Sequence, residues 1–297
     1  MTTWLFAAAA VACLVLRWTV LERHFDATPL LFALAPFNAM TFSMRRALAW
    51  TRGAVRLSDE PKERLFEGAL AVKEQGLRDR YRLGPLYERS TTYVYRENLY
   101  VLDLLERHGP RLAGRTSIRA IDVGSKDFRY AFGLARWLRS SSREVSLTGL
   151  ELDGYPMYPD LHSRREHGEA YAAQVDDADV RYAVADFLTH EEAEVDVLFF
   201  FFPFVLEYAL LRWGLPRRCF VPICLFEHAY RMLRPGGVVV VMNHTEEERL
   251  RQIELLEASG FEVTTSERSQ CDLVDYANEV PERSMTIARR RASSAGE

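Results

Sequence analysis

The stretch Arg119–Gly124, which reads RAIDVG, is predicted to be an apolar strand that ends in an acid and a glycine. Three comparable segments follow it in order: Val145–Asp153 (VSLTGLELD), Tyr182–Leu188 (YAVADFL) and Leu233–Met242 (LRPGGVVVVM), the last a helix end, a Pro-Gly-Gly turn and an apolar strand. Strands that alternate with helical segments predict an α/β fold, with a doubly wound, mostly parallel sheet flanked by helices.

The segments between these strands complete the predicted sheet. Tyr130–Arg139 (YAFGLARWLR) is predicted to be the first crossover helix, because parallel strands need such a connection. Val195–Val205 (VDVLFFFFPFV) is a fourth strand, and its continuous apolarity is typical of a strand buried on both faces. Glu246–Ser259 predicts a further helix, and Phe261–Thr265 predicts a strand that pairs antiparallel with Ser284–Ala288.

The order of these segments resembles that of the Rossmann-like class I methyltransferases, which use S-adenosylmethionine (SAM). The resemblance covers roughly Arg119 to Ser266, about half of the chain. It implies a SAM cofactor at the carboxyl ends of the strands and transfer of its methyl group to a small or lipid-like acceptor. The Leu-Arg-Pro-Gly-Gly turn before an apolar strand is common in these enzymes, and it is more specific in order with Glu151 and Asp186.

The resemblance also implies which residues bind the cofactor. Glu151 would accept both hydroxyl protons of the ribose, Asp186 would accept from the adenine amine, and Phe187 would contact the adenine ring. Each acid has an alternative role as the cap of the helix that follows it. The remaining cofactor positions that we expect are Asp122, Gly124, Ser125, Lys126, Leu152, Phe202 and Pro203.

The loop after the first strand departs from the acid-x-Gly-x-Gly-x-Gly pattern of the family. Asp122 and Gly124 are retained, but the later glycines are replaced in the sequence Gly-Ser-Lys-Asp-Phe-Arg-Tyr. Those glycines let the backbone approach the methionine end of SAM, so Ser125 and Lys126 must be accommodated or the cofactor must lie differently. Lys126 either binds the cofactor carboxylate or is a solvated loop residue. Lost glycines can also mark a chain that no longer binds SAM.

Methyl transfer needs mainly alignment and removal of water, because the sulfonium is already a good leaving group. A base is required only if the acceptor loses a proton. His244 and Glu246, after the fifth strand, are the candidate catalytic groups, with Asn243 beside them. Tyr155 and His162 are further candidates. A lone histidine is, however, more often a structural residue.

Two further segments bear on the site. Tyr155–His167 is longer than a strand-to-helix connection requires, and it is either a substrate-binding segment or a surface extension. Tyr93 and Tyr95 precede the predicted helix Glu97–His108, and they either line the cofactor pocket or pack in the core.

Other function classes remain as alternatives or are disfavoured. The chain could be a non-catalytic scaffold that binds SAM or its product, or neither. A nicotinamide-dependent oxidoreductase would need G-x-G-x-x-G after the first strand, and this is absent. The net charge of −4, without a dense Lys/Arg patch, gives no reason to expect a nucleic-acid partner.

The four cysteines form no CxxC pair and no Cys/His cluster with zinc spacing, so we expect no metal site. Free cysteines are typical of a cytoplasmic protein.

The amino-terminal part differs in composition from the rest. Residues 4–16 (WLFAAAAVACLVL) and 29–44 are apolar, and residues 1–58 carry a net charge of +4 against −8 for the remainder. A basic segment beside apolar stretches suits the cytoplasmic face of an anionic membrane; alternatively, these helices cap the domain or an oligomer interface. We therefore predict a helical extension over 1–57, a methyltransferase-like domain over 58–290 that opens with a helix over 58–80, and a disordered tail over 291–297.

Overall fold

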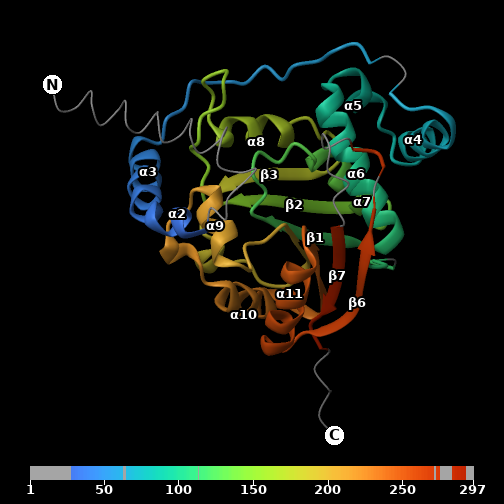
Figure 1. Ribbon diagram of the computed structural model, residues 1–297. Coiled ribbons are helices and arrows are strands. Elements are labelled where there is room, and N and C mark those ends of the chain that lie inside the picture. The colour runs from blue at the N-terminus through green and yellow to red at the C-terminus, as the bar shows by residue number, and fades with distance from the viewer. Residues whose placement is uncertain (1–27, 63–64, 113, 271, 275–282, 292–297) are drawn as a thin grey trace, which may run out of the picture. The chain divides into compact units, whose positions relative to one another are not determined.

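The computed structural model describes residues 28–297 apart from 63–64, 113, 271, 275–282 and 292–297 (Figure 1). The apolar run 4–16 and nearly all of the expected tail therefore lie outside the described residues. Two compact units are distinguished: one takes in the chain up to Met44 together with Leu206–Phe220, and the other takes in Arg45–Val205 and Val221–Glu297. The domain boundary expected after residue 57 stays a prediction.

The second unit is built on a seven-stranded sheet with the order β3-β2-β1-β4-β5-β7-β6. Its strands are β1 (Ser117–Val123), β2 (Glu144–Glu151), β3 (Asp179–Val184), β4 (Val195–Phe201), β5 (Leu233–Asn243), β6 (Glu262–Ser269) and β7 (Arg283–Arg289). Strands β1 to β5 are parallel, and β7 runs antiparallel to both β5 and β6. The predicted α/β class, the doubly wound parallel sheet and the antiparallel terminal pair are confirmed.

Helices cover both faces of this sheet (Figure 1). They include α6 (Thr92–His108), α7 (Ala131–Arg139), α8 (Arg164–Ala172), α10 (Pro222–Met232) and α11 (Glu246–Ala258). Strand β4 shows why both faces must be covered, because every one of its residues is buried. Phe199 packs against Trp137 of α7, whereas its neighbour Phe200 packs against Phe226 of α10. Successive side chains of a strand point to opposite faces, so each face needs its own helical layer.

Strand β5 begins earlier than expected, because it includes the residues that were predicted to form a helix end and a turn. It begins at Leu233, which pairs with Val195, but the next pair joins Val238 to Val197. The Pro-Gly-Gly residues therefore form an irregular bulge within β5, and Gly236 takes a positive φ of 74° there. The turn chemistry was recognised in the sequence, but its place inside a strand was not.

The predicted helix over residues 58–80 is wrong in its first half, because α4 extends only from Gly68 to Arg80. The described residues before it are not helical. Tertiary contacts explain this, since the ammonium group of Lys62 donates to the backbone carbonyls of Tyr87 and Ser90. The short helix α5 (Gly84–Glu88) follows α4.

The first unit contains α2 (Thr28–Ala33), most of α3 (Ala35–Leu48) and α9 (Glu207–Trp213). The buried amide of Asn38 donates to the carbonyl of Leu211 at 3.0 Å, which ties α3 to α9 across 173 residues of sequence. Within the described ranges, no helix combines the length and the apolar character that crossing a membrane would require.

Candidate functional site

The carboxyl edge of the sheet gathers three of the predicted cofactor residues. Strands β1 and β4 are neighbours at the centre of the sheet, and the strand order reverses between them. Ligands of doubly wound folds bind at such a reversal. Asp122 lies near the end of β1, Glu151 is the last residue of β2, and Asp186 follows β3 by two residues. Residues far apart in the sequence therefore present three carboxylates at one edge.

Glu151 is buried and already accepts several hydrogen bonds. One carboxylate oxygen accepts from the backbone N–H of Lys126 at 2.8 Å, and the other accepts from that of Asp153 at 2.8 Å. The guanidinium of Arg164 lies 3.4 Å from the second oxygen. Burial raises the pKa of Glu151, and the charge of Arg164 and the two N–H donors offset only part of this rise. The carboxylate is thus held in a fixed orientation.

Arg164 was not among the residues expected from the sequence. It is the first residue of α8, is only 7% exposed, and also donates to the carbonyl of Asp153 at 2.9 Å. A local signal for its place was present, because Ser163-x-x-Glu166 is a capping box that begins a helix at the next residue. No feature of the sequence indicated that the helix start lies against Glu151.

Asp122 has an unusual environment for a carboxylate. It is completely buried, and one oxygen accepts from the hydroxyl of Tyr130 at 2.7 Å. The other oxygen has no hydrogen-bond partner among the described residues. Burial raises the pKa of Asp122 to about 7; the Tyr130 hydrogen bond opposes this rise, and the charge of Glu151 adds to it. Asp122 therefore changes its charge near neutral pH.

The loop after β1 holds two non-glycine residues in a left-handed backbone conformation. Gly124 has a φ of 76°, and Lys126 and Phe128 have φ values of 54° and 56° without being glycine. Phe128 is fully buried against the backbone of Gly149, where an added Cβ would lie 2.8 Å from the Phe128 ring. The loop is therefore shaped by the Phe128 side chain as well as by Gly124.

Two polar residues of this loop face inward. Ser125 is fully buried, and its hydroxyl has no hydrogen-bond partner among the described residues. The backbone of Lys126 donates to Glu151 and accepts from the hydroxyl of Tyr182. Burial, together with the nearby Arg129, lowers the pKa of the Lys126 ammonium.

The predicted adenine contacts have roles within the protein. Asp186 caps the short 3-10 helix Phe187–Thr189 by accepting from the N–H of Leu188 at 3.0 Å. Phe187 is buried, and its ring packs edge-on against Phe200 and His228. Leu152 is half-buried. Asp186 keeps acceptor capacity beyond its cap, but the adenine assignments stay predictions.

The candidate catalytic residues lie after β5. His244 stacks on Phe202, with ring centroids 4.0 Å apart, and the guanidinium of Arg283 lies 4.4 Å from the Phe202 centroid. Glu246 is paired with Arg249, and this hydrogen bond is the main cause that lowers its pKa to about 2. A carboxylate with so low a pKa is a weak base at neutral pH.

Several neighbouring residues complete this part of the edge. Asn243 is fully buried, and neither polar atom of its side chain has a hydrogen-bond partner among the described residues. Phe202 takes a positive φ of 62°, which ends β4 before the predicted Val205 and turns the chain into the half-buried Pro203. Tyr155 and His162 lie in the connection between β2 and α8.

A cavity of about 300 Å³ lies beside the loop that follows β1. Tyr93 at the start of α6 and Tyr158 of the β2–α8 connection line it, together with Asp127 and Arg129. Arg129 and the Tyr158 hydroxyl both donate to Asp127. Tyr95, by contrast, is fully buried and packs on Tyr87. Of the two tyrosines considered from the sequence, only Tyr93 lines this cavity.

These groups fit the nucleoside part of SAM. Beside Gly124, a Cβ would meet no atom within 4 Å, so the backbone is open to a ligand at this point. The unpartnered oxygen of Asp122 and the remaining acceptor positions of Glu151 suit hydroxyl donors. A ribose would share the Glu151 carboxylate with Arg164 or displace it. The assignment of Gly124, Glu151 and Asp186 to a nucleoside stays a prediction.

No protein-family model and no curated protein matches the sequence. Solved structures do resemble it. One is a chain of a complex that contains the Haloferax volcanii Trm112 methyltransferase activator, with 15% identity over 78% of this chain and 100% of that one, at a TM-score of 0.45. A SAM-dependent methyltransferase from Methanosarcina mazei is 11% identical over 60% and 95% of the two chains, at a TM-score of 0.42.

The cyclase SpnF is 14% identical over 82% of this chain and 100% of its own, at a TM-score of 0.46. These likenesses carry no activity to this protein, because one fold supports many chemistries. What is established is the architecture: a reversal of strand order between β1 and β4, parallel strands β1 to β5 and an antiparallel β7. The protein has a Rossmann-like, doubly wound α/β fold.

Proposed function

We propose that this protein binds SAM at the carboxyl edge of β1 and β2 and transfers its methyl group to a small or lipid-like acceptor. The observation that supports this most is the buried, oriented carboxylate of Glu151 beside the open backbone of Gly124. A carboxylate held in this orientation can accept hydrogen bonds from two ribose hydroxyls. SAM, when bound, supplies an electrophilic methyl group; the chain's own residues align the acceptor and exclude water.

The test is calorimetric titration of the full-length protein with SAM and S-adenosylhomocysteine (SAH). Glu151→Gln keeps the size of the side chain but removes its charge, so we expect affinity to fall by about 1–3 kcal/mol. Glu144→Gln is the matched control, because Glu144 is exposed at the opposite end of the same strand. Equal affinity of the wild type and Glu151→Gln would remove the ribose assignment.

A second candidate function is a scaffold that has lost the cofactor. The packing of Phe128 against Gly149 favours it, because a side chain is buried in the loop that usually leaves room for the methionine end of SAM. Absence of SAM and SAH binding by protein with a cooperative thermal transition would support the scaffold. Micromolar binding that is lost in Glu151→Gln would support the enzyme.

We also propose that the amino-terminal part contacts the cytoplasmic face of a membrane. Met40 and Met44 are exposed one turn apart on α3, and the apolar run 4–16 precedes this helix in the sequence. Exposed apolar side chains beside arginines suit an anionic lipid surface. A lipid-like acceptor would be consistent with this location.

A further inference from the structure

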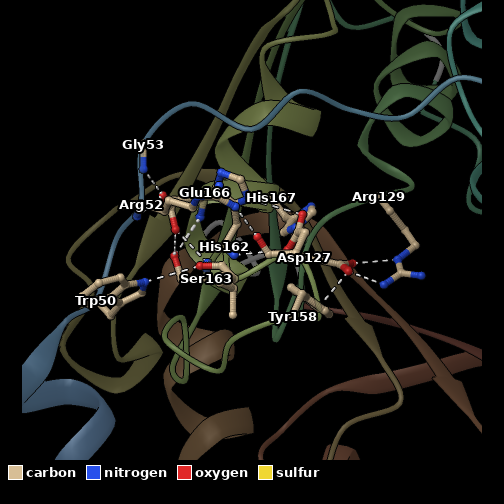
Figure 2. Close-up of polar contacts among 12 residues, drawn as sticks. Trp50, Arg52, Gly53, Asp127, Arg129, Tyr158, His162, Ser163, Glu166 and His167 are labelled. Carbon is tan, nitrogen blue, oxygen red and sulfur yellow. Dashed lines mark hydrogen bonds and ion pairs between the residues drawn. The ribbon is translucent and has the colours of Figure 1, made fainter.

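Residues 45–53, which we call the strap, are bound to the segment that follows Glu151. This segment, residues 152–163, joins β2 to α8 and is called the connection below. The indole N–H of Trp50 donates to the carbonyl of Leu161 at 3.3 Å, and the guanidinium of Arg52 donates to the carbonyl of Asp160 at 2.7 Å (Figure 2). The strap therefore binds the connection near its carboxyl-terminal end, shortly before α8 begins.

Glu166 joins the strap to the start of α8. One carboxylate oxygen accepts from the backbone N–H groups of Arg52 and Gly53, at 2.6 and 2.5 Å (Figure 2). The other oxygen accepts from the N–H and the hydroxyl of Ser163, both at 2.7 Å. A single buried carboxylate thus closes the capping box of α8 and binds two consecutive residues of the strap.

Asp153 joins the strap to the candidate cofactor site. Its carboxylate is paired with Arg45, which donates to one oxygen at 2.7 Å and to the other at 3.3 Å. Its backbone N–H donates to Glu151, and its carbonyl accepts from Arg164. Arg45 is therefore separated from the predicted ribose-binding carboxylate by one residue, Asp153, with which both are in direct contact.

The ion pair between Arg45 and Asp153 is sensitive to the loss of either partner. The Asp153 side chain is 3% exposed, and that of Arg45 is 28% exposed. Removing the guanidinium leaves a buried carboxylate without its cation, which is strongly unfavourable and favours movement of Asp153 towards solvent. Such a movement displaces the Asp153 backbone, whose N–H orients Glu151.

We propose that the strap is a positioning element of the candidate cofactor site. Through Arg45 and Glu166 it holds the connection so that the Asp153 backbone and Arg164 lie against the carboxylate of Glu151. The basic segment that the sequence associated with a membrane surface thereby belongs in part to the ligand site. The part of this inference that concerns SAH affinity rests on the proposed function, whereas the part that concerns the order of the connection does not.

The experiment compares three variants of the full-length protein. Arg45→Met keeps most of the apolar stem but removes the charge, and Glu166→Gln places an amide opposite N–H donors. Arg56→Met is the matched control, because Arg56 is exposed and lies just beyond the strap. Hydrogen–deuterium exchange of ligand-free protein is measured in peptides that cover residues 153–167. We expect exchange there to become about tenfold faster in the first two variants and to stay unchanged in the control.

SAH affinity, measured across pH, provides the second readout. We expect Arg45→Met to bind SAH about tenfold more weakly near neutral pH, with partial recovery in Arg45→Lys. The acidic limb of its pH profile should also move to higher pH, because Glu151 loses the donors that favour its charged form. A merely structural defect would lower affinity equally at every pH.

The two readouts separate the inference from the proposed function. If the wild type binds no SAH, the proposed function fails, and hydrogen exchange still decides whether the strap orders the connection. If exchange over 153–167 is unchanged in both Arg45→Met and Glu166→Gln, the positioning role is wrong. If exchange rises but the pH profile of SAH binding keeps its shape, the strap stabilises the connection without positioning Glu151, and the inference is also overturned.

Discussion

Asp122 shows how a single buried carboxylate can make the stability of this fold depend on pH. Its pKa of about 7 lies well above the ordinary value, because burial disfavours the charged form. The folded protein therefore keeps a proton that the unfolded chain has already lost between about pH 4 and pH 7. Over this range stability falls as the pH rises, and it falls until the folded form has also lost the proton.

Asp122→Asn should remove this dependence. Asparagine can still accept from Tyr130, but it carries no charge to bury. We expect the stability of the variant relative to the wild type to increase by about 2 kcal/mol between pH 5 and pH 8. Urea unfolding at the two pH values measures this. If the difference in unfolding free energy between the wild type and the variant is the same at both pH values, Asp122 does not titrate in this range.

At the scale of elements, the β1 loop and strand β2 depend on one another. Phe128 takes a left-handed backbone conformation and fills the space above Gly149. The glycine in β2 is therefore required by close approach of the ring and not by its own φ. The left-handed Phe128 in the β1 loop and the glycine in the neighbouring strand are therefore two parts of one packing arrangement.

Gly149→Ala should destabilise the protein by about 1–3 kcal/mol, because the added Cβ would lie 2.8 Å from the Phe128 ring. Phe128→Leu in the Gly149→Ala background should recover part of this loss in urea unfolding. Gly76→Ala is the control: no atom lies within 4 Å of its added Cβ, and it is inside α4. That substitution should stabilise the protein by a few tenths to about 1 kcal/mol. Equal effects at the two glycines would rule out the packing explanation.

At the scale of the whole molecule, the strap decides where the chain can be shortened. A version that begins at Ser58 lacks Arg45, Trp50 and Arg52, and so leaves the carboxylate of Asp153 buried without its cation. A version that begins at Thr28 keeps the strap and removes only the apolar run with its flanking residues.

We expect the version from Thr28 to keep the thermal stability of the full-length protein, and the version from Ser58 to lose several degrees of melting temperature. If the apolar run 4–16 binds lipid, the full-length protein should be found in the membrane fraction and both shortened versions should be absent from it. Equal melting temperatures of the two versions would show that the strap contributes nothing to the second unit. A version from Thr28 that stays with membranes would assign the contact to α2 and α3.

The sequence alone was sufficient for the architecture. The apolar runs that became β1, β2, β4 and β5, with helical periodicity between them, predicted a parallel doubly wound sheet, because hydrophobic patterning and crossover connections leave few alternatives. Asp122, Glu151 and Asp186 each lie at or just after the end of a predicted strand. The sequence therefore also predicted that they share one edge of the sheet, since the carboxyl ends of parallel strands lie at the same edge. Boundaries were less well predicted where distant contacts act, as for Lys62, which holds residues before α4 in a non-helical conformation.

Only the tertiary structure decided which side chains of the protein itself contact the residues of the predicted site. Arg164 lies against Glu151, Phe128 fills the loop, and Arg45 reaches Asp153 across 108 residues. None of these contacts has a local signature, because a side chain's partner is set by how remote segments fold onto the same edge. Local sequence determines secondary structure and the direction of the strands, whereas the neighbours of a buried charge depend on packing that only the complete fold specifies.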